Sequence, residues 1–317
     1  TQLSVAERNF RGRGQLLRLQ LGLSSEVQSY NFAFTEPYFY NRDVSAGFRL
    51  YKTDRSYDNQ AGLETAETGF GVNLGFPLSD DGRLSLFANF SEDELINSSS
   101  NSVVNPSYTN QKLEFGYFYG IDKRDDFVDP TAGWAFSFGQ DIAGPALDVT
   151  YLRTRLRADY YYELAEGYVF HARAKVGIIN DYRGGAVNYN DRFFEGGSSF
   201  RGFDRSGVGP RQISTGYALG ANRYIVGTTE VSLPLGLPKE LGMKANAFID
   251  FGVLGDTDTF SAVAGDIQDD FAFRATYGLS VSWKSPFGPV RFDFADAIKE
   301  ESYDETRSFR FTIGTNF

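Results

Sequence analysis

The sequence predicts an all-β protein, a transmembrane antiparallel β-barrel, on three observations. Apolar and polar residues alternate with a period of two in one segment after another, as in strands with one face in lipid and the other in a wet lumen. Short turns and long loops alternate between these segments, which is typical of barrels of the outer membrane. Aromatic residues are abundant, with 30 Phe and 19 Tyr, while Met occurs once, which favours strands over helices.

Fifteen strands follow from this alternation, and they form one domain that covers residues 1–317. The expected strands are 2–10, 15–24, 28–40, 43–53, 67–78, 82–91, 111–124, 133–142, 148–164, 167–181, 222–237, 242–254, 271–284, 289–297 and 307–317. Short connections include 79–82 and 286–288, and long ones include 92–110, 182–221 and 255–270. Bacterial single-chain barrels have an even number of strands. A count of fifteen therefore means either a miscount or a strand that lies outside this sequence.

The alternation also assigns faces. Arg or Lys at the lipid midplane costs about 2–4 kcal/mol, so the basic positions should face the lumen. The positions expected to face lipid are Leu152, Leu156, Tyr160, Phe170, Ala174, Val176, Phe309 and Phe311, and those expected to face the lumen are Arg153, Arg155, Arg157, Arg173, Lys175 and Arg310. Five of these residues, Arg153, Arg155, Arg157, Arg173 and Lys175, form a basic patch that could make a pore anion-selective, or that could pair with lumenal acids or with an inserted loop. The long connection 182–221 favours pairing.

Composition argues against several functional classes. The net charge of −10 argues against a nucleic-acid partner. The chain has no Cys, which excludes disulfides and thiolate metal sites, and its one histidine, His171, lies mid-strand on the polar face, where a hydrogen-bonding role is expected rather than catalysis. The acidic segment IDKRDDFVDP, 121–130, lacks the spacing of a calcium loop and is interpreted as a polar turn. We expect no enzyme activity, no metal and no cofactor.

The stretch FFEGGSSFRGFDRSGVGPRQ, 193–212, breaks the alternation within the connection 182–221. It is rich in glycine, yet it contains none of the phosphate-binding glycine motifs. A loop of this length inside a compact domain is usually functional or disordered. Its four phenylalanines argue against disorder, so we expect the loop to fold into the lumen.

The centre of this stretch is Phe200-Arg201-Gly202-Phe203, and a buried arginine needs acidic partners. Glu230 and Asp250 lie on the polar faces of two successive expected strands, so both should point inward. A guanidinium can bridge two such acids with forked hydrogen bonds, and Gly202 allows a sharp turn beside it. Arg201 could instead be an exposed loop residue, but the two inward acids and the flanking phenylalanines favour an internal strut.

The chain resembles the C-terminal barrels of the BamA family, within the wider group of outer-membrane insertases and translocators. The hallmark of this group is an inward loop with an Arg-Gly-Phe/Tyr core, matched here by GGSSFRGF at 196–203. Further matches are FTEPYF at 34–39, LGFPL at 74–78, DKRDDFVDPTAG at 122–133, FIDFG at 248–252, SPFGPVRF at 285–292 and the terminal aromatic Phe317. The resemblance covers essentially the whole chain.

The resemblance implies a sixteen-stranded barrel of the bacterial outer membrane, preceded by periplasmic POTRA domains. Residues 1–10 resemble the second strand of such barrels, so the first strand and the POTRA domains are expected upstream and are absent here. The implied function is an outer-membrane protein assembly factor, which folds and inserts β-barrel proteins through an openable seam between the first and last strands. The implied partners are unfolded outer-membrane proteins, the lipid bilayer and accessory lipoproteins of an assembly complex.

The seam residues implied on the last strand are Phe309, Phe311, Ile313 and Phe317. Templating of client strands at this edge is the mechanism that the resemblance implies. Two alternatives remain open at this point. One is a related translocator or an assembly factor for autotransporters, and the other, which fits less well, is a passive porin.

Overall fold

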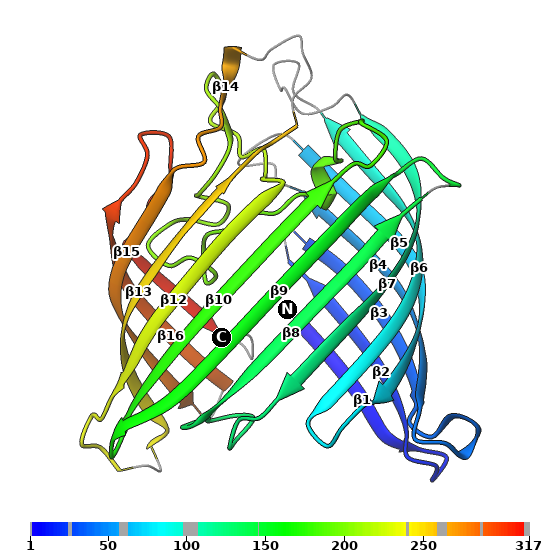
Figure 1. Ribbon diagram of the computed structural model, residues 1–317, viewed down its shortest axis with the longest axis horizontal. Coiled ribbons are helices and arrows are strands. Elements are labelled where there is room, and N and C mark those ends of the chain that lie inside the picture. Colours follow the sequence, from blue (N-terminus) through cyan, green and yellow to red (C-terminus); the bar gives the residue numbers. More distant parts are fainter. Residues whose placement is uncertain are drawn as a thin grey trace.

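The computed structural model describes residues 2–24, 27–56, 63–97, 107–144, 146–238, 241–258, 265–285 and 288–313. Fifteen strands form one antiparallel sheet in which neighbours along the chain are neighbours in space (Figure 1). They are β1 Gln2–Phe10, β2 Gln15–Leu23, β3 Val27–Glu36, β4 Ser45–Ser56, β5 Leu63–Pro77, β6 Gly82–Asn97, β7 Tyr108–Asp122, β8 Gly133–Ala143, β9 Tyr151–Ala165, β10 Tyr168–Asn180, β12 Arg223–Leu233, β13 Met243–Gly255, β15 Phe273–Ser285, β16 Gly288–Lys299 and β17 Phe309–Ile313. The predicted strand count is therefore confirmed for this sheet.

Two short strands, β11 Arg211–Gln212 and β14 Ile267–Gln268, pair with each other outside the large sheet. Two single turns of 3-10 helix, η1 Phe39–Asn41 and η2 Tyr189–Asp191, complete the secondary structure of the described residues. None of the helices in the described part of the chain is long and apolar enough to cross a membrane.

Four strand boundaries differ from the expected ones by four residues or more. β5 begins at Leu63 rather than at residue 67, and β12 ends at Leu233, before Pro234, rather than at residue 237. The ends of β3 and β6 also differ. The strand expected over 28–40 ends at Glu36, because Pro37 lacks the N–H that would continue the ladder, and the chain then enters η1. The strand expected to end at residue 91 continues to Asn97 through the acidic segment SEDELIN. Here β6 keeps its register with both β5 and β7, for example Glu92 opposite Thr68 and Gln111. Backbone pairing continues where the side chains no longer alternate between apolar and polar.

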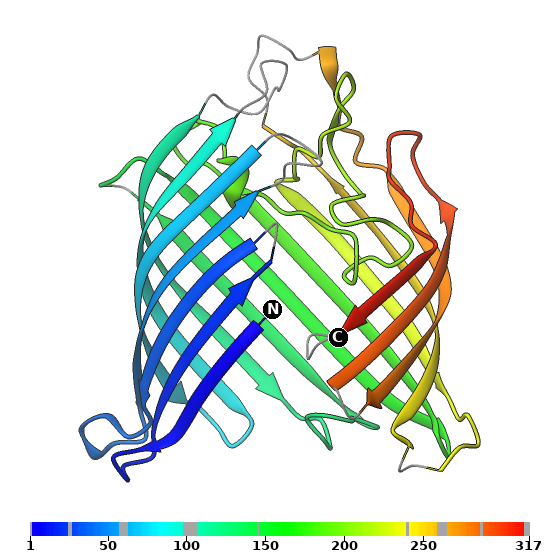
Figure 2. The ribbon, with the colours of Figure 1, turned by 180° about the vertical axis from the view of Figure 1, so that it is seen from behind.

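The inward face of the sheet is identified by its contacts with the loop that joins β10 to β12, residues 181–222, which we call the inward loop. Figure 2 shows this loop between the walls of the barrel. Lys175 of β10 pairs with Glu195 of the loop, Asp250 of β13 pairs with Arg201, and Arg310 of β17 donates to the carbonyl of Phe203. Side chains at the same parity as these three residues face the lumen.

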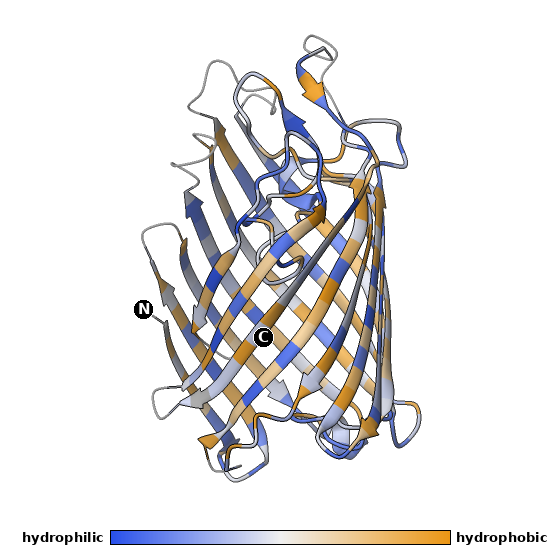
Figure 3. Ribbon diagram, turned by 90° about the vertical axis from the view of Figure 1, so that its left-hand side faces the viewer, coloured by the Kyte–Doolittle hydropathy of each residue, from blue (hydrophilic) through white to orange (hydrophobic). Residues whose placement is uncertain are grey.

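The opposite face carries the apolar residues, as the alternating colours along the strands in Figure 3 show. All eight positions predicted to face lipid lie on it, because each alternates with a lumenal basic residue of its own strand. Leu152, Tyr160, Phe309 and Phe311 are 40%, 48%, 49% and 50% exposed, as expected for side chains that contact lipid rather than a protein core. The predicted assignment of both faces is confirmed.

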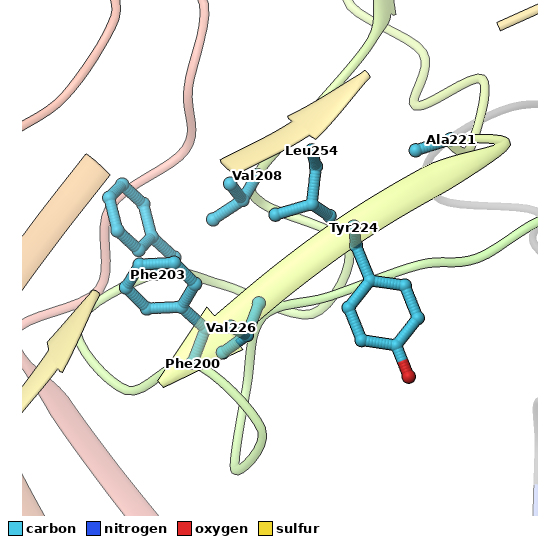
Figure 4. Close-up of a cluster of buried hydrophobic side chains, with 7 residues drawn as sticks. All are labelled: Phe200, Phe203, Val208, Ala221, Tyr224, Val226 and Leu254. Atoms are coloured by element: carbon cyan, nitrogen blue, oxygen red, sulfur yellow. The ribbon is translucent and has the colours of Figure 1, made fainter. Parts of the chain in front are cut away.

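The buried apolar residues gather between the inward loop and the wall, not between layers of sheet. One cluster is drawn in Figure 4 and consists of Phe200, Phe203, Val208, Ala221, Tyr224, Val226 and Leu254. Phe200 and Phe203 contact edge to face, with ring centroids 5.1 Å apart. The apolar residues of the inward loop are therefore packed against this stretch of the lumenal wall.

Candidate functional site: the inward loop and the seam strand

The two ends of the inward loop are hydrogen-bonded to each other. Phe193 and Ala221 exchange two backbone hydrogen bonds of 2.8 Å, so the long segment between them leaves the wall and returns at nearly one place. Between these residues the loop carries the FRGF core and the residues around it. This closure explains how a connection of about forty residues stays ordered inside the barrel.

Arg201 bridges the two predicted acids. Its Nη1 donates to Glu230 Oε2 at 2.6 Å, and its Nε and Nη2 donate to the two carboxylate oxygens of Asp250, each at 2.8 Å. The backbone N–H of Arg201 adds a fourth bond to Asp250 at 3.0 Å. The contact predicted from the parity of the two strands is present, and it involves both acids.

The surroundings hold this guanidinium in one orientation. Its plane lies over the ring of Phe248, with the guanidinium carbon 3.4 Å from the ring centroid. Thr228 donates to Asp250 at 2.8 Å, and Arg291 lies 3.6 Å from Glu230. Burial by itself lowers the pKa of Arg201, but the hydrogen bonds and charges of Asp250 and Glu230 outweigh this effect, and its pKa is raised above the ordinary value.

Gly202 is required at its position for a steric reason as well as a conformational one. Its φ is +90°, and a Cβ there would lie 2.7 Å from the Thr276 side chain. The close approach lets Thr276 donate its hydroxyl to the carbonyl of Arg201 at 2.7 Å. Two successive residues of the loop core, Arg201 and Gly202, therefore contact three strands, β12, β13 and β15.

A second anchor on the opposite wall was not anticipated from the sequence. Lys112 of β7 lies 2.8 Å from Asp93 of β6 and 2.8 Å from Asp191 of η2 in the loop. All three side chains are buried. Lys112 has lumenal parity, which the alternation does indicate, but its loop partner is 79 residues away and no local pattern points to it.

The basic patch on β9 and β10 is neutralised by acids in the lumen. Arg153 and Arg155 share Asp141 at 2.8 and 2.9 Å, Arg173 pairs with Asp159 at 2.7 Å, and Lys175 reaches Glu195 of the loop at 3.1 Å. This outcome agrees with the interpretation that the patch pairs with lumenal acids and the loop.

His171 and the acidic turn have structural surroundings. The His171 ring is stacked on Tyr161 and hydrogen-bonded to Asp159 at 3.0 Å. In the 121–130 segment the Asp125 carboxylate accepts bonds from the backbone of Thr131 and Ala132, as in a polar turn. No group of three or more metal-ligating side chains occurs among the described residues.

The last described strand, β17, is bound to the sheet on one side. It pairs with β16 from Phe309 opposite Phe294 to Ile313 opposite Val290. Within the described ranges no pairing of β17 with β1 is found, and Figure 2 shows these two strands as the edges of the sheet. Phe309, Phe311 and Ile313 point outward, and Ile313 is 63% exposed. Phe317 lies outside the described residues.

The inward loop also holds the segment that leads into β17. Asp204 N donates to Glu305 O at 2.8 Å, Glu305 N donates to Gly207 O at 2.9 Å, and Arg307 N donates to Gly202 O at 2.9 Å. We call this set of contacts, between residues 202–207 and 305–310, the latch. It was not predicted from the sequence.

Charged side chains reinforce the latch. The Asp204 carboxylate lies 3.3 Å from Arg307 and 3.5 Å from Arg310. Arg211 of the loop pairs with Glu305 at 2.9 Å. Because Asp204 follows Arg201 by three residues, the same short segment contacts the β12–β13 wall and the seam strand.

Comparison with known proteins shows which family has this arrangement. The family model described as the Omp85 superfamily domain matches residues 9–317. Two curated relatives, both named outer membrane protein assembly factor BamA, come from Neorickettsia risticii and Neisseria meningitidis serogroup B. They are 30% and 23% identical and match 99% of this chain. The chain spans 42% and 44% of their lengths.

Solved structures show the same fold. BamA from Haemophilus ducreyi, crystallised without POTRA domains 1–3, superposes with a TM-score of 0.88 at 21% identity over 98% of this chain and 66% of that one. CdiB from Acinetobacter baumannii superposes with a TM-score of 0.63 at 12% identity, covering 97% of this chain and 54% of that one. The family match over nearly all of the sequence and the apolar outward face lead to one conclusion: the chain belongs to the Omp85 superfamily and is a β-barrel of the bacterial outer membrane.

Proposed function

We propose that this barrel is the membrane domain of an outer-membrane protein assembly factor, which promotes the folding and insertion of other β-barrel proteins. The observation that carries the proposal is the inward loop, whose core is bound to the wall through Arg201 and to the segment that leads into β17 through residues 202–207. The names of the curated relatives support it. The partners proposed are unfolded outer-membrane proteins and, in a larger complex, accessory lipoproteins.

The mechanism proposed is strand addition at β17, whose described residues pair with β16. A strand edge presents backbone N–H and C=O groups that a second chain can pair with. In lipid each unsatisfied backbone group costs several kcal/mol. A client strand that pairs here forms backbone hydrogen bonds that it cannot form alone in the bilayer. The free energy of client folding drives the process, and no covalent chemistry is involved.

The proposed role of the inward loop is to hold the seam strand at a defined position. Phe200, Arg201, Gly202 and Phe203 bind the loop core to the wall, with Glu230 and Asp250 as the acids that receive the guanidinium. The latch then connects this fixed core to the entry of β17. In this proposal the strut keeps the edge in place while a client pairs with it.

Site-specific cross-linking tests the proposed client site. A photo-reactive phenylalanine analogue at Phe311 samples the edge, and the same analogue at Phe170 is the matched control, since Phe170 also faces outward but lies on a strand paired on both sides. An unfolded, labelled outer-membrane protein should cross-link at position 311 and not at 170. Equal yields at both positions would mean that clients contact the outer surface without preference for the edge.

A reconstitution assay tests the activity itself. Client barrels should acquire heat-resistant gel mobility faster in liposomes that contain the protein than in empty ones. A passive porin is separated by conductance, because a lumen occupied by the anchored loop should pass little steady current in a planar bilayer. A large, steady conductance without client folding would contradict the proposal.

A further inference from the structure

A hollow on the lipid-facing surface of β8, β9, β10 and β12 arises from a row of small residues. In the register of the sheet Phe136, Ala158, Ala174, Gly227 and Phe251 lie side by side on five successive strands. Three small residues stand between two phenylalanines, so the surface is low in the middle and high at both ends. The hollow has a volume of about 510 Å³, within the range of sites for small ligands.

The next row deepens the hollow and gives it a rim. Trp134, Tyr160, Ala172 and Thr229 are cross-strand partners in that order. Phe251 leans over Gly227, where an added Cβ would lie 2.6 Å from its ring, so the open floor consists of Ala158, Ala172 and Ala174. Because the floor belongs to a continuous backbone ladder, the shape of the hollow does not depend on mobile loops.

The position of the hollow places it in the periplasmic half of the membrane. Trp134 follows the first residue of β8, at the same end of the sheet as the short turn 79–82, because Asp122 N donates to Asp81 O; short turns lie on the periplasmic side of such barrels. Aromatic residues at this level mark the interface between acyl chains and headgroups. A lipid in the hollow would therefore belong to the periplasmic leaflet.

The ammonium group of Lys123 lies close to the place where the headgroup of such a lipid would be. The Lys123 ammonium is 5.9 Å from the centroid of the Trp134 ring, and Lys123 N donates to the carbonyl of Trp134 at 2.8 Å. The only acid paired with Lys123 in the described structure is Asp81, at 3.8 Å, and the Lys123 side chain is 52% exposed. An ammonium that is weakly paired and open to the interface suits a phosphate group.

We propose that this hollow is a binding site for one glycerophospholipid of the periplasmic leaflet, with an acyl chain on the alanine floor and its phosphate beside Lys123. Bulk lipid covers the whole outer face, but a chain that lies in a walled hollow buries more apolar surface than one on a flat wall. The added attraction of Lys123 should favour lipids with a net negative headgroup. The site is separate from the seam and does not depend on the proposed function.

The two tryptophans of the chain allow a direct test. Trp134 lines the hollow, and Trp283 lies on β15, also close to the short-turn end of its strand. They are 39% and 38% exposed, and both lie near the short-turn ends of their strands, so they compare a position at the hollow with one away from it. Trp283→Phe leaves the hollow reporter, and Trp134→Phe leaves the matched control reporter.

The measurement is fluorescence quenching by an anionic phospholipid brominated on its acyl chain, mixed at increasing mole fraction into unlabelled zwitterionic lipid. Trp134 should be quenched to half its limit at a mole fraction several-fold lower than Trp283, whose quenching should follow the bulk composition. Ala172→Phe, which fills the floor, should bring Trp134 to the behaviour of Trp283. Ala88→Phe, an outward position on β6, is the control for added bulk and should leave the preference intact.

Lys123→Gln separates the two parts of the site. It should abolish the preference for the anionic headgroup while quenching by a brominated zwitterionic lipid persists. Folding of each variant is checked by heat-modifiable gel mobility, and Ala174→Leu replaces Ala172→Phe if the latter does not fold. Identical quenching curves for Trp134 and Trp283, or a preference that survives filling of the floor, would overturn the proposal.

Discussion

The β9–β10 wall and the β16–β17 seam are built from similar alternating sequences but are held in different ways. β9 and β10 pair along their whole length, from Ala165 opposite Tyr168 to Leu152 opposite Asn180, and each has a further neighbour. β17 pairs with one strand, from Phe309 to Ile313 within the described residues. The wall is held by its ladder, whereas the entry of the seam strand is held in addition by contacts with the inward loop.

Because of this difference, the seam strand can open locally while the wall of the same sheet stays paired. Local opening needs few contacts to break where few hold a segment, and the segment that leads into β17 is bound to the inward loop by the small set of contacts in the latch. The latch in turn rests on Arg201, because residues 201–204 are one short segment. A change at the strut should therefore affect the seam more than the wall.

The largest effect is expected from Arg201→Ala. It leaves Asp250 without its cation and Glu230 with only Arg291, 3.6 Å away, and removal of one partner of a buried ion pair costs about 3–5 kcal/mol. Amide hydrogen exchange in residues 305–313 should accelerate strongly, while exchange in β9 and β10 changes little. Arg201→Lys should restore only part of the protection, because an ammonium cannot form the forked contact. Equal acceleration in wall and seam would refute the dependence of the seam on the strut.

Lys112→Met tests the other anchor and should have a somewhat smaller effect. It leaves Asp93 and Asp191 close together without their cation, at a cost of about 3 kcal/mol. Exchange should increase in residues 187–195 and at the ends of β6 and β7. The latch should stay protected, since Arg201 still binds the loop core. Loss of protection at 305–313 in this variant would show that the two anchors act as one unit.

Asp204→Asn should weaken the latch alone. Its ion pairs with Arg307 and Arg310 are partly exposed, and such pairs contribute about 0.2–1 kcal/mol. The thermal midpoint of the barrel should barely change, while exchange at Thr306–Arg310 rises a few-fold. An unchanged exchange rate there would assign the latch to its backbone bonds only.

The smallest effect concerns the turn between β7 and β8. Hydrogen bonds from Thr131 and the backbone of Ala132 lower the pKa of Asp125 to about 2. Because the folded pKa lies below the ordinary aspartate value of about 3.9, the contribution of Asp125 is present above pH 4 and is lost as the pH falls through 2. Exchange at residues 125–132 should increase in that window, and Asp125→Asn should remove this pH dependence. Persistence of the acid transition in the variant would assign it to another group.

Much of the fold could be predicted because the barrel follows local rules. Alternation with a period of two is imposed residue by residue by lipid on one side and water on the other, and it placed Arg153 and Leu152 on the correct faces. The same parity predicted that Glu230 and Asp250 both point inward, and hence the partners of Arg201. Where the rule ceases to act, as in the acidic extension of β6 beyond residue 91, the prediction of the strand end was wrong.

The sequence by itself determined the strand order, the two faces and the need of a buried arginine for two acids, since each depends on neighbours along the chain or on adjacent strands. The tertiary structure alone decided that Asp191 reaches Lys112, that Asp204 lies between Arg307 and Arg310, and that Ala158, Ala172 and Ala174 form one hollow. The ionic contacts join residues as far as 79 and 106 positions apart and depend on the path of the loop, while the hollow depends on the register of adjacent strands. The physical reason is that the period of two fixes the face on which a side chain lies but not its partner, so only the three-dimensional path of the chain brings these partners together.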